Sequence, residues 1–331
     1  MMSGGVLECL CSTAKLERDK GVVELQKSIS TLSDTELNEL QEAIVALFRR
    51  DDSPWETKHG ALKGTTVILH SKRSSRDFVT YIKDNLSPLL DDEEFRVRLA
   101  AGEAMGALCE SVGVKIYIDA KADILKGIAD NLEREPSAAD QEDNARHDEI
   151  VLSSLTSGGS SKSFSLSRCN SAEKIFHDTA GWKSLETWMK CLQNVIAEPW
   201  EFTDGCINLV AELASLPPMS STVTQLLPFV ANAASFRHYT QHLYLLETVC
   251  KRLPAMAHGI GKRNFKSQLE TFFDCVFYAL TCDSPLTSSA ASQCLNALGS
   301  FLGPSILRGR VEIYNPKYLE MLDANQYIAP L

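Results

Sequence analysis

The stretch Leu86–Gly113, LSPLLDDEEFRVRLAAGEAMGALCESVG, decides the fold of this chain. In its second half the residues Val97, Ala101, Ala104 and Leu108 follow one another at steps of four, three and four. This spacing places side chains on one face of an α-helix. Four acidic residues precede that helix, where a capping side chain and negative charge are favourable. The stretch therefore predicts two antiparallel helices joined by a tight turn.

The same unit occurs 40 residues earlier in the chain. A shift of 40 aligns Asp52 with Asp92, Trp55 with Phe95, Lys58 with Arg98, Ala61 with Ala101, and Ile68 with Leu108. A repeat of this length is typical of stacked helical arrays. The period predicts an all-α chain in which helix pairs stack on one another.

Several residues of the stretch resemble the second helix of a HEAT repeat, namely Asp92, Val97, Arg98, Ala101, Met105 and Leu108. The resemblance is strong at 86–113, moderate at 37–69 and weaker in the rest of the chain. It implies a right-handed α-solenoid of about six HEAT- or armadillo-like helix pairs. It also implies that Asp92, Arg98 and the aligned Asp52 tie neighbouring repeats together.

The repeats are interrupted once, by a serine-rich stretch without helical periodicity. On its far side Pro199-Trp200-Glu201 repeats Pro54-Trp55-Glu56, and a glycine stands six residues after each proline. We therefore expect five segments: a lead-in with a short helix at 1–32, N-terminal repeats at 33–156, a flexible linker or loop at 157–178, C-terminal repeats at 179–302, and a cap or tail at 303–331.

The serine-rich stretch is also the best candidate for regulation. Arg168 stands three residues before Ser171, a pattern that basophilic kinases accept, and a phosphate would add about −2 charge. We take Ser165 and Ser171 as candidate phosphorylation sites. The alternative is a passive linker.

Composition limits the functions open to the chain. No run of about 18 apolar residues is present, so the sequence predicts no membrane span and a cytoplasmic protein, with the nucleus as the alternative. Most of the ten cysteines lie within apolar helical patterns, which favours reduced, packed thiols. A net charge of −10 argues against binding nucleic acid through bulk charge.

No pattern for catalysis stands out in the sequence. The phosphate-binding motif GxxxxGK[ST] and the nucleophile motif GxSxG are both missing, and the histidines are scattered singly. We therefore expect no enzymatic activity, no cofactor and no metal. Two alternatives stay open: a helical-repeat enzyme, and a nucleic-acid-binding repeat protein that uses the basic residues near the C-terminal end.

Stacked helix pairs form an extended concave surface, and the resemblance implies that such surfaces hold other proteins. We therefore predict a non-catalytic scaffold or adaptor within a protein complex. The partner would lie along the second helices and contact Lys58, Arg96 and Glu103.

Overall fold

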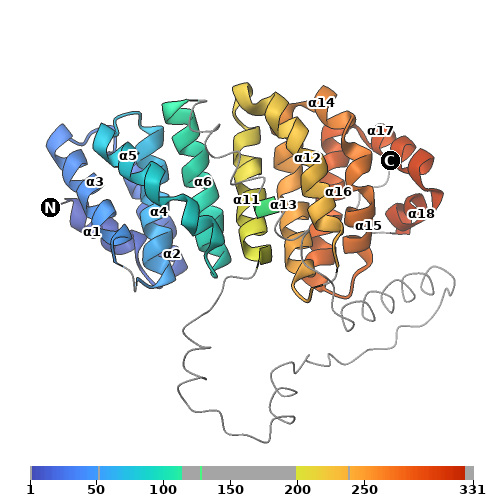
Figure 1. Cartoon of the computed structure of the whole chain (residues 1–331), viewed down its shortest axis with the longest axis horizontal. Helices are drawn as coiled ribbons and strands as arrows, with labels where there is room; N and C mark the ends of the chain where they lie inside the picture. The colour runs from blue at the N-terminus through green and yellow to red at the C-terminus, as the bar shows by residue number, and fades with distance from the viewer. Residues whose placement is uncertain (1, 51–52, 114–126, 129–198, 238, 325–331) are drawn as a thin grey trace, which may run out of the picture.

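The protein is described here by a computed structural model, which covers residues 2–50, 53–113, 127–128, 199–237 and 239–324 (Figure 1). The elements before residue 114 are α1 (Met2–Leu10), α2 (Lys15–Ser28), α3 (Asp34–Phe48), α4 (Trp55–His70), α5 (Arg76–Asn85), the 3-10 helix η1 (Ser87–Asp91) and α6 (Phe95–Val112). The later elements are α11 (Pro199–Ala214), η2 (Pro217–Met219), α12 (Ser220–Ser235), α13 (His242–Ile260), α14 (Lys262–Lys266), η3 (Leu269–Phe272), α15 (Phe273–Thr281), α16 (Pro285–Leu302), α17 (Pro304–Tyr314) and α18 (Pro316–Ala324).

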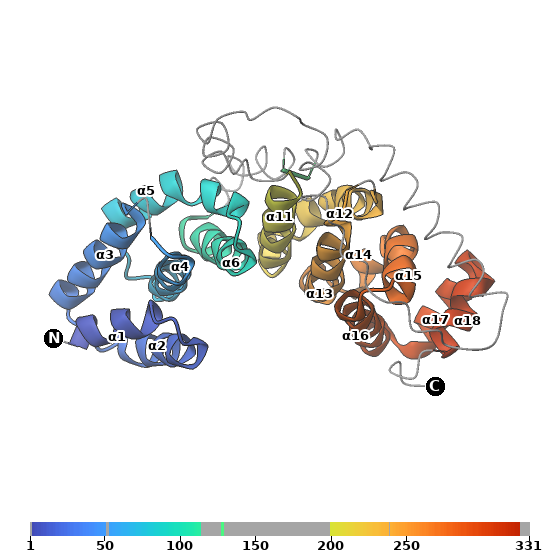
Figure 2. The same ribbon diagram turned by 90° about the horizontal axis from the view of Figure 1, so that it is seen from below.

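The helices form two rows that curve into an arch (Figure 2). The inner row consists of α2, α4, α6, α11, α13 and α16, and each of these helices packs against the next. Helices α3, α5, α12 and α15 form the outer row, and the inner row lines the concave side (Figure 2). Every element in the described ranges is a helix, which confirms the predicted fold class for them. The two rows are consistent with an α-solenoid.

Local sequence signals explain several helix ends. Ser33 and Glu36 stand three residues apart, the spacing that predicts a capping box, and they form that box at the start of α3. The Ser33 side chain accepts from the Glu36 amide, and the Glu36 carboxylate accepts from the Ser33 amide. Ser284 caps α16 and Pro285 occupies its first position. The sequence predicts one helix that opens within 52–55 and runs to about Leu69, and a second at 285–302. The observed helices are α4 at Trp55–His70 and α16 at Pro285–Leu302.

The N-terminal segment differs from our expectation. We expected a lead-in with one short helix at 1–32, whereas the structure has the helix pair α1 and α2 there. Only Arg18, Gly21 and Leu25 of α2 are buried. Because this helix buries so few apolar side chains, its sequence shows no clear apolar stripe.

The inner row passes directly from α6 to α11, although residues 114–198 separate them in the sequence. Two residues of the intervening segment, Gly127 and Ile128, are described, and the Thr203 hydroxyl donates to the Gly127 carbonyl at 2.5 Å. The apolar residues Ile124, Leu125, Ile128 and Leu132 predict a helix that includes both. The sequence also predicts helices at 140–155 and 182–195, and these lie, like the linker 157–178, outside the described residues.

The glycines of the two Pro-Trp-Glu units explain why that pattern repeats. A Cβ atom on Gly60 of α4 would lie 2.3 Å from the carbonyl oxygen of Leu10, and one on Gly205 of α11 would lie 2.0 Å from that of Leu90. Real Cβ atoms do not approach so closely. Both glycines therefore allow the end of a preceding helix to rest on an inner-row helix.

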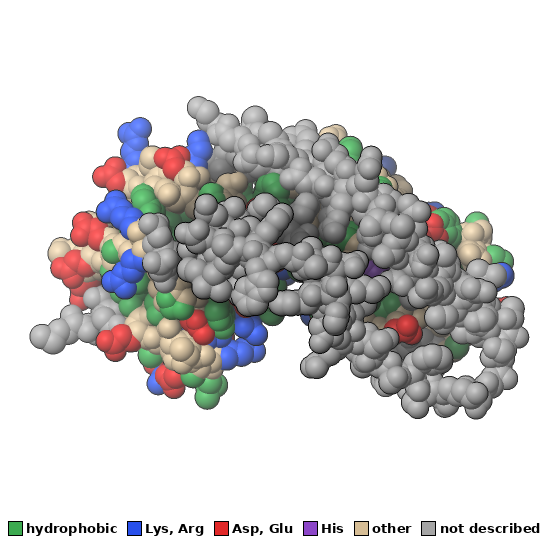
Figure 3. Space-filling view, turned by 60° about the horizontal axis from the view of Figure 1, so that its bottom comes forward, with side chains coloured by type: hydrophobic (Ala, Val, Ile, Leu, Met, Phe, Trp, Pro, Cys, Tyr) green, Lys and Arg blue, Asp and Glu red, His purple; other side chains and the backbone are tan. Residues whose placement is uncertain are grey.

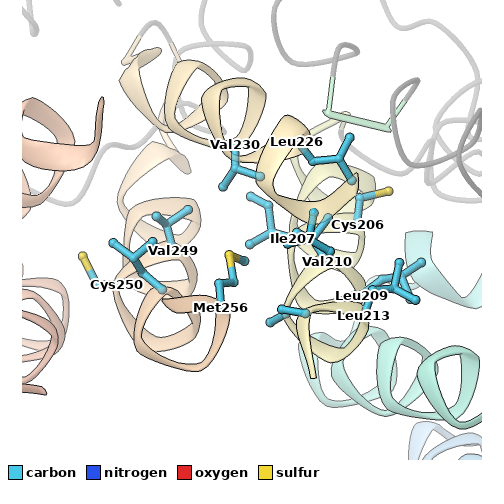
Figure 4. Close-up of a cluster of buried hydrophobic side chains, with 14 of the residues drawn as sticks. Cys206, Ile207, Leu209, Val210, Leu213, Leu226, Val230, Val249, Cys250 and Met256 are labelled. Atoms are coloured by element: carbon cyan, nitrogen blue, oxygen red, sulfur yellow. The ribbon is translucent and has the colours of Figure 1, made fainter. Parts of the chain in front are cut away.

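The core runs along the array between the two rows. Between α11, α12 and α13, Figure 4 shows Ile207 and Val210 facing Val230 and Met256. Buried free cysteines are part of this core, namely Cys109, Cys206, Cys250, Cys275, Cys282 and Cys294. Burial raises the pKa of the Cys109 thiol to about 11 and that of Cys275 to about 12. These thiols are packed side chains, as their apolar surroundings in the sequence predict.

The C-terminal segment forms two further helices, α17 and α18, and residues 325–331 lie outside the described part. The hydroxyls of Tyr314 and Tyr318 both donate to the Asp274 carboxylate of α15, at 2.8 and 2.9 Å. Helix α17 also packs against α16. Residues 304–324 therefore extend the array.

Candidate protein-binding face

Polar contacts across the array join residues that are 40 positions apart. His70 Nδ1 lies 3.1 Å from a Glu110 carboxylate oxygen, and three ion pairs share this separation: Lys63 with Glu103, Glu212 with Arg252, and Glu270 with Arg310. Each pair connects equivalent positions of successive helix pairs. The 40-residue period of the sequence is therefore also the period of the contacts between neighbours.

Arg98 forms a deeply buried connection between two helix pairs. Its Nη1 donates to the carbonyls of Asp92 and Glu93 at 2.8 and 3.1 Å, and its Nε donates to Asp204 Oδ2 of α11 at 2.8 Å. The guanidinium also lies over the Trp200 ring, 4.9 Å from its centroid. Arg98 is 1% exposed and Asp204 is 2% exposed. The side chain therefore links α6 to α11 inside the core.

Asp92 connects the preceding pair of helices. Its Oδ2 lies 2.7 Å from the Nζ of Lys58 on α4, and its side chain is 6% exposed. The Asp92 and Arg98 side chains thus contact different neighbours: Asp92 joins its helix pair to the preceding one, and Arg98 joins it to the next. Asp52, which we aligned with Asp92, lies outside the described residues.

The three predicted partner contacts lie near one another on α4 and α6. The Lys58 ammonium group forms an ion pair with Asp92, and the Glu103 carboxylate forms one with Lys63. The Arg96 guanidinium lies over the Trp55 ring at 4.6 Å, and its side chain is 45% exposed. Of the three side chains, Arg96 is the most exposed to a partner.

The surface shows charges of both signs. In the N-terminal part of Figure 3, at the left, basic and acidic side chains are interspersed among the described residues. A hollow of about 200 Å³ lies where α4, α6 and α11 meet, lined by Thr66, His70, Glu103, Gly106, Ala107, Glu110, Glu212, Ser215 and Leu216. It gives the inner row a concave feature built from three successive helices.

Sequence reasoning missed the group of residues around Trp55. Arg18 of α2 lies over the Trp55 ring at 4.7 Å, so two arginines contact this indole. Burial, together with Lys63 and Arg18, lowers the pKa of His59 to about 4. A further shift of 40 residues toward the N-terminus aligns Arg18 with Lys58 and Arg98. This alignment is the sequence signal that could have identified Arg18.

The candidate phosphorylation sites Ser165 and Ser171 lie outside the described residues. Within the described ranges, no group of three or more His, Cys, Asp or Glu side chains is placed to hold a metal ion. In the same part of the chain, no helix has the length and apolar character of a membrane span.

No family model and no curated protein matches the sequence. Among solved structures, the chain is similar to an engineered protein from the Northeast Structural Genomics Consortium, with 12% identity over 91% of this chain and 97% of that one and a TM-score of 0.31. It is also similar to a mutant of Kap121p, with 11% identity over 98% of this chain and 39% of that one and a TM-score of 0.27. At this level of similarity neither protein tells what this chain binds.

Proposed function

We propose that this chain is a non-catalytic scaffold that holds another protein on the concave side of its arch. We further propose that the array is a right-handed solenoid of about six HEAT- or armadillo-like helix pairs, acting in the cytoplasm. Phosphorylation of the serine-rich segment at Ser165 or Ser171 stays a prediction from the sequence.

The observation that supports this function is the continuous inner row. Six helices pack in succession, and the later ones carry open stripes of exposed side chains toward the concave side. On α13 this stripe includes Tyr244, Lys251 and Ala255, and on α16 it includes Gln293 and Asn296. A repeated surface of this length suits an extended protein segment better than a small ligand.

A matched pair of substitutions tests the face. Gln293→Arg adds a long charged side chain to the concave side of α16, and Gln225→Arg makes the same change on α12 in the outer row. Both glutamines are exposed, so we expect both variants to fold.

The readout is the amount of a stoichiometric partner that each purified variant retains, measured by affinity capture and mass spectrometry. We expect Gln293→Arg combined with Ala255→Arg to lose most of the partner, whereas Gln225→Arg retains it. Equal recovery by all variants would reject the concave face as the binding surface. Lys58 is a poor choice for this test because its reversal would also break the contact with Asp92.

A further inference from the structure

Arg18 and Arg98 occupy equivalent positions in the array. Each is the fourth residue of an inner-row helix, since α2 begins at Lys15 and α6 begins at Phe95. The Nη1 of Arg18 donates to the carbonyls of Ser12 and Thr13, six and five residues earlier, at 2.8 and 2.9 Å. Arg98 makes the same two contacts with the carbonyls six and five residues before it.

The next inner-row helix completes the equivalence. Arg18 lies over Trp55 at 4.7 Å and Arg98 lies over Trp200 at 4.9 Å, and both tryptophans belong to the Pro-Trp-Glu units. We call this arrangement of an arginine, two backbone carbonyls and a tryptophan the arginine cradle. The chain therefore contains two copies of the cradle, one between α2 and α4 and one between α6 and α11.

The two cradles differ at one position. Four residues after Trp200 stands Asp204, which accepts from the Nε of Arg98 at 2.8 Å. Four residues after Trp55 stands His59. Within the described residues, the buried Nε of Arg18 and the buried Nδ1 of His59 have no hydrogen-bonding partner. Arg18 is only 5% exposed, and a buried guanidinium without an anion is unfavourable.

The charges around the first cradle favour an anion. The positive charges of Arg18, Lys63 and Arg96 all disfavour the protonated form of His59. One nearby negative charge, that of Asp19, favours it. Lys58 and Lys63 have carboxylate partners of their own, and Arg96 lies 3.4 Å from Glu94. Among these cations, Arg18 is thus the one without a carboxylate partner within the described residues. The half-exposed Arg96 side chain contacts the same tryptophan ring.

We propose that the first arginine cradle binds a carboxylate from an acidic segment of a protein partner, which pairs with Arg18 as Asp204 pairs with Arg98. The inference rests on the proposed scaffold function, because it identifies an acidic protein segment as one thing that the inner row holds.

The substitution His59→Asp tests the cradle by supplying the carboxylate from within the chain. If the two cradles are equivalent, the introduced carboxylate pairs with Arg18, raises the melting temperature and competes with the external carboxylate. His59→Asn introduces a side chain of the same size as Asp without the negative charge and serves as the matched control.

Binding is measured by fluorescence anisotropy with a labelled hexaglutamate peptide, and a hexaglutamine peptide is the neutral control. We expect hexaglutamate to bind the unsubstituted protein and the His59→Asn variant alike. His59→Asp should weaken binding at least about tenfold, the factor that corresponds to 1.4 kcal/mol. Hexaglutamine should not bind.

Four outcomes would overturn the proposal. They are no binding of hexaglutamate to the unsubstituted protein, equal weakening by both variants, a lowered melting temperature of His59→Asp, and competition by inorganic phosphate as effective as that by hexaglutamate. The last would indicate a general anion site. None of these results depends on the Gln293→Arg experiment, so the cradle and the concave face can fail separately.

Discussion

Burial gives single charged residues very different roles in this protein. Arg98 and Asp204 lie in the core, where removing one partner leaves a charge without compensation. Arg96, two residues before Arg98, lies on the surface over Trp55. The two arginines look alike in the sequence, but Arg98 joins two helices inside the core and Arg96 is exposed to solvent.

Replacing Asp204 by Asn tests the structural role. The amide keeps the size of the side chain but removes the negative charge beside Arg98, so we expect a loss of about 3–5 kcal/mol in the free energy of unfolding. Chemical denaturation measures this loss. The control is Asp283→Asn at an exposed position, which should change stability by less than about 0.5 kcal/mol. A loss no larger than that of the control would show that the buried pair contributes little.

His59 makes stability depend on pH. Its pKa falls from 6.5 to about 4 in the folded chain, so the unfolded chain binds more protons between these values. Stability should therefore be complete above pH 6.5 and decrease as the pH falls toward 4, by about 1–2 kcal/mol because the ring is only half-buried. The melting temperature, plotted against pH across this range, should change less for His59→Gln than for the unsubstituted protein. Parallel curves would contradict the depressed pKa.

At the scale of helices, close packing depends on glycines whose open side is filled by another chain segment. Alanine is a better helix former than glycine by about 1 kcal/mol, so propensity alone favours replacing them. At Gly60 and Gly205, however, an added Cβ would collide with the backbone of Leu10 and Leu90. Backbone atoms cannot move aside as a flexible side chain can, and the collision outweighs the propensity.

We expect glycine-to-alanine substitutions at Gly60 and Gly309 to change the stability of the protein in opposite directions. Gly60→Ala should destabilise the protein by about 1–3 kcal/mol, the usual cost of overpacking. Gly309→Ala in α17 should stabilise it by about 0.5–1 kcal/mol, because no atom lies within 4 Å of an added Cβ. Thermal unfolding of both variants provides the comparison. The packing explanation would be wrong if both substitutions stabilised the chain.

At the scale of the whole molecule, each helix pair contacts mainly its neighbours in the array. Stability in such an array is approximately a sum over repeats and the interfaces between them. A defect at one end should therefore be felt most strongly by the helices nearest to it. The test positions on α13 and α16 and the first arginine cradle between α2 and α4 lie in different parts of this array and can respond separately.

Hydrogen exchange can show this local response. In Gly60→Ala, amide protection should decrease in α1, α2 and α4, while α13 and α16 keep most of theirs. Peptide-resolved exchange followed by mass spectrometry measures both regions in one sample. A uniform loss of protection along the chain would indicate that the array unfolds as a single cooperative unit.

The sequence by itself determined the helical class, the 40-residue period and the ends of helices that carry capping or proline signals. These features are set locally, by apolar spacing, capping side chains and prolines. Both ends of α16 follow from its sequence, and the capping box of α3 was found from Ser33 and Glu36 alone. Only one short helix was predicted where α1 and α2 lie, and the first turns of α2 were missed because its buried positions are Arg18, Gly21 and Leu25.

Only the tertiary structure decided which residues meet. Asp204 lies 106 positions from Arg98, and no periodicity in the chain indicates that the inner row passes from α6 directly to α11. The equivalence of Arg18 and Arg98 likewise appears only when their backbone contacts and tryptophans are seen together. The role of a charged side chain depends on the group that it contacts across a packed interface. The fold determines which group this is, because the two residues can be far apart in the sequence.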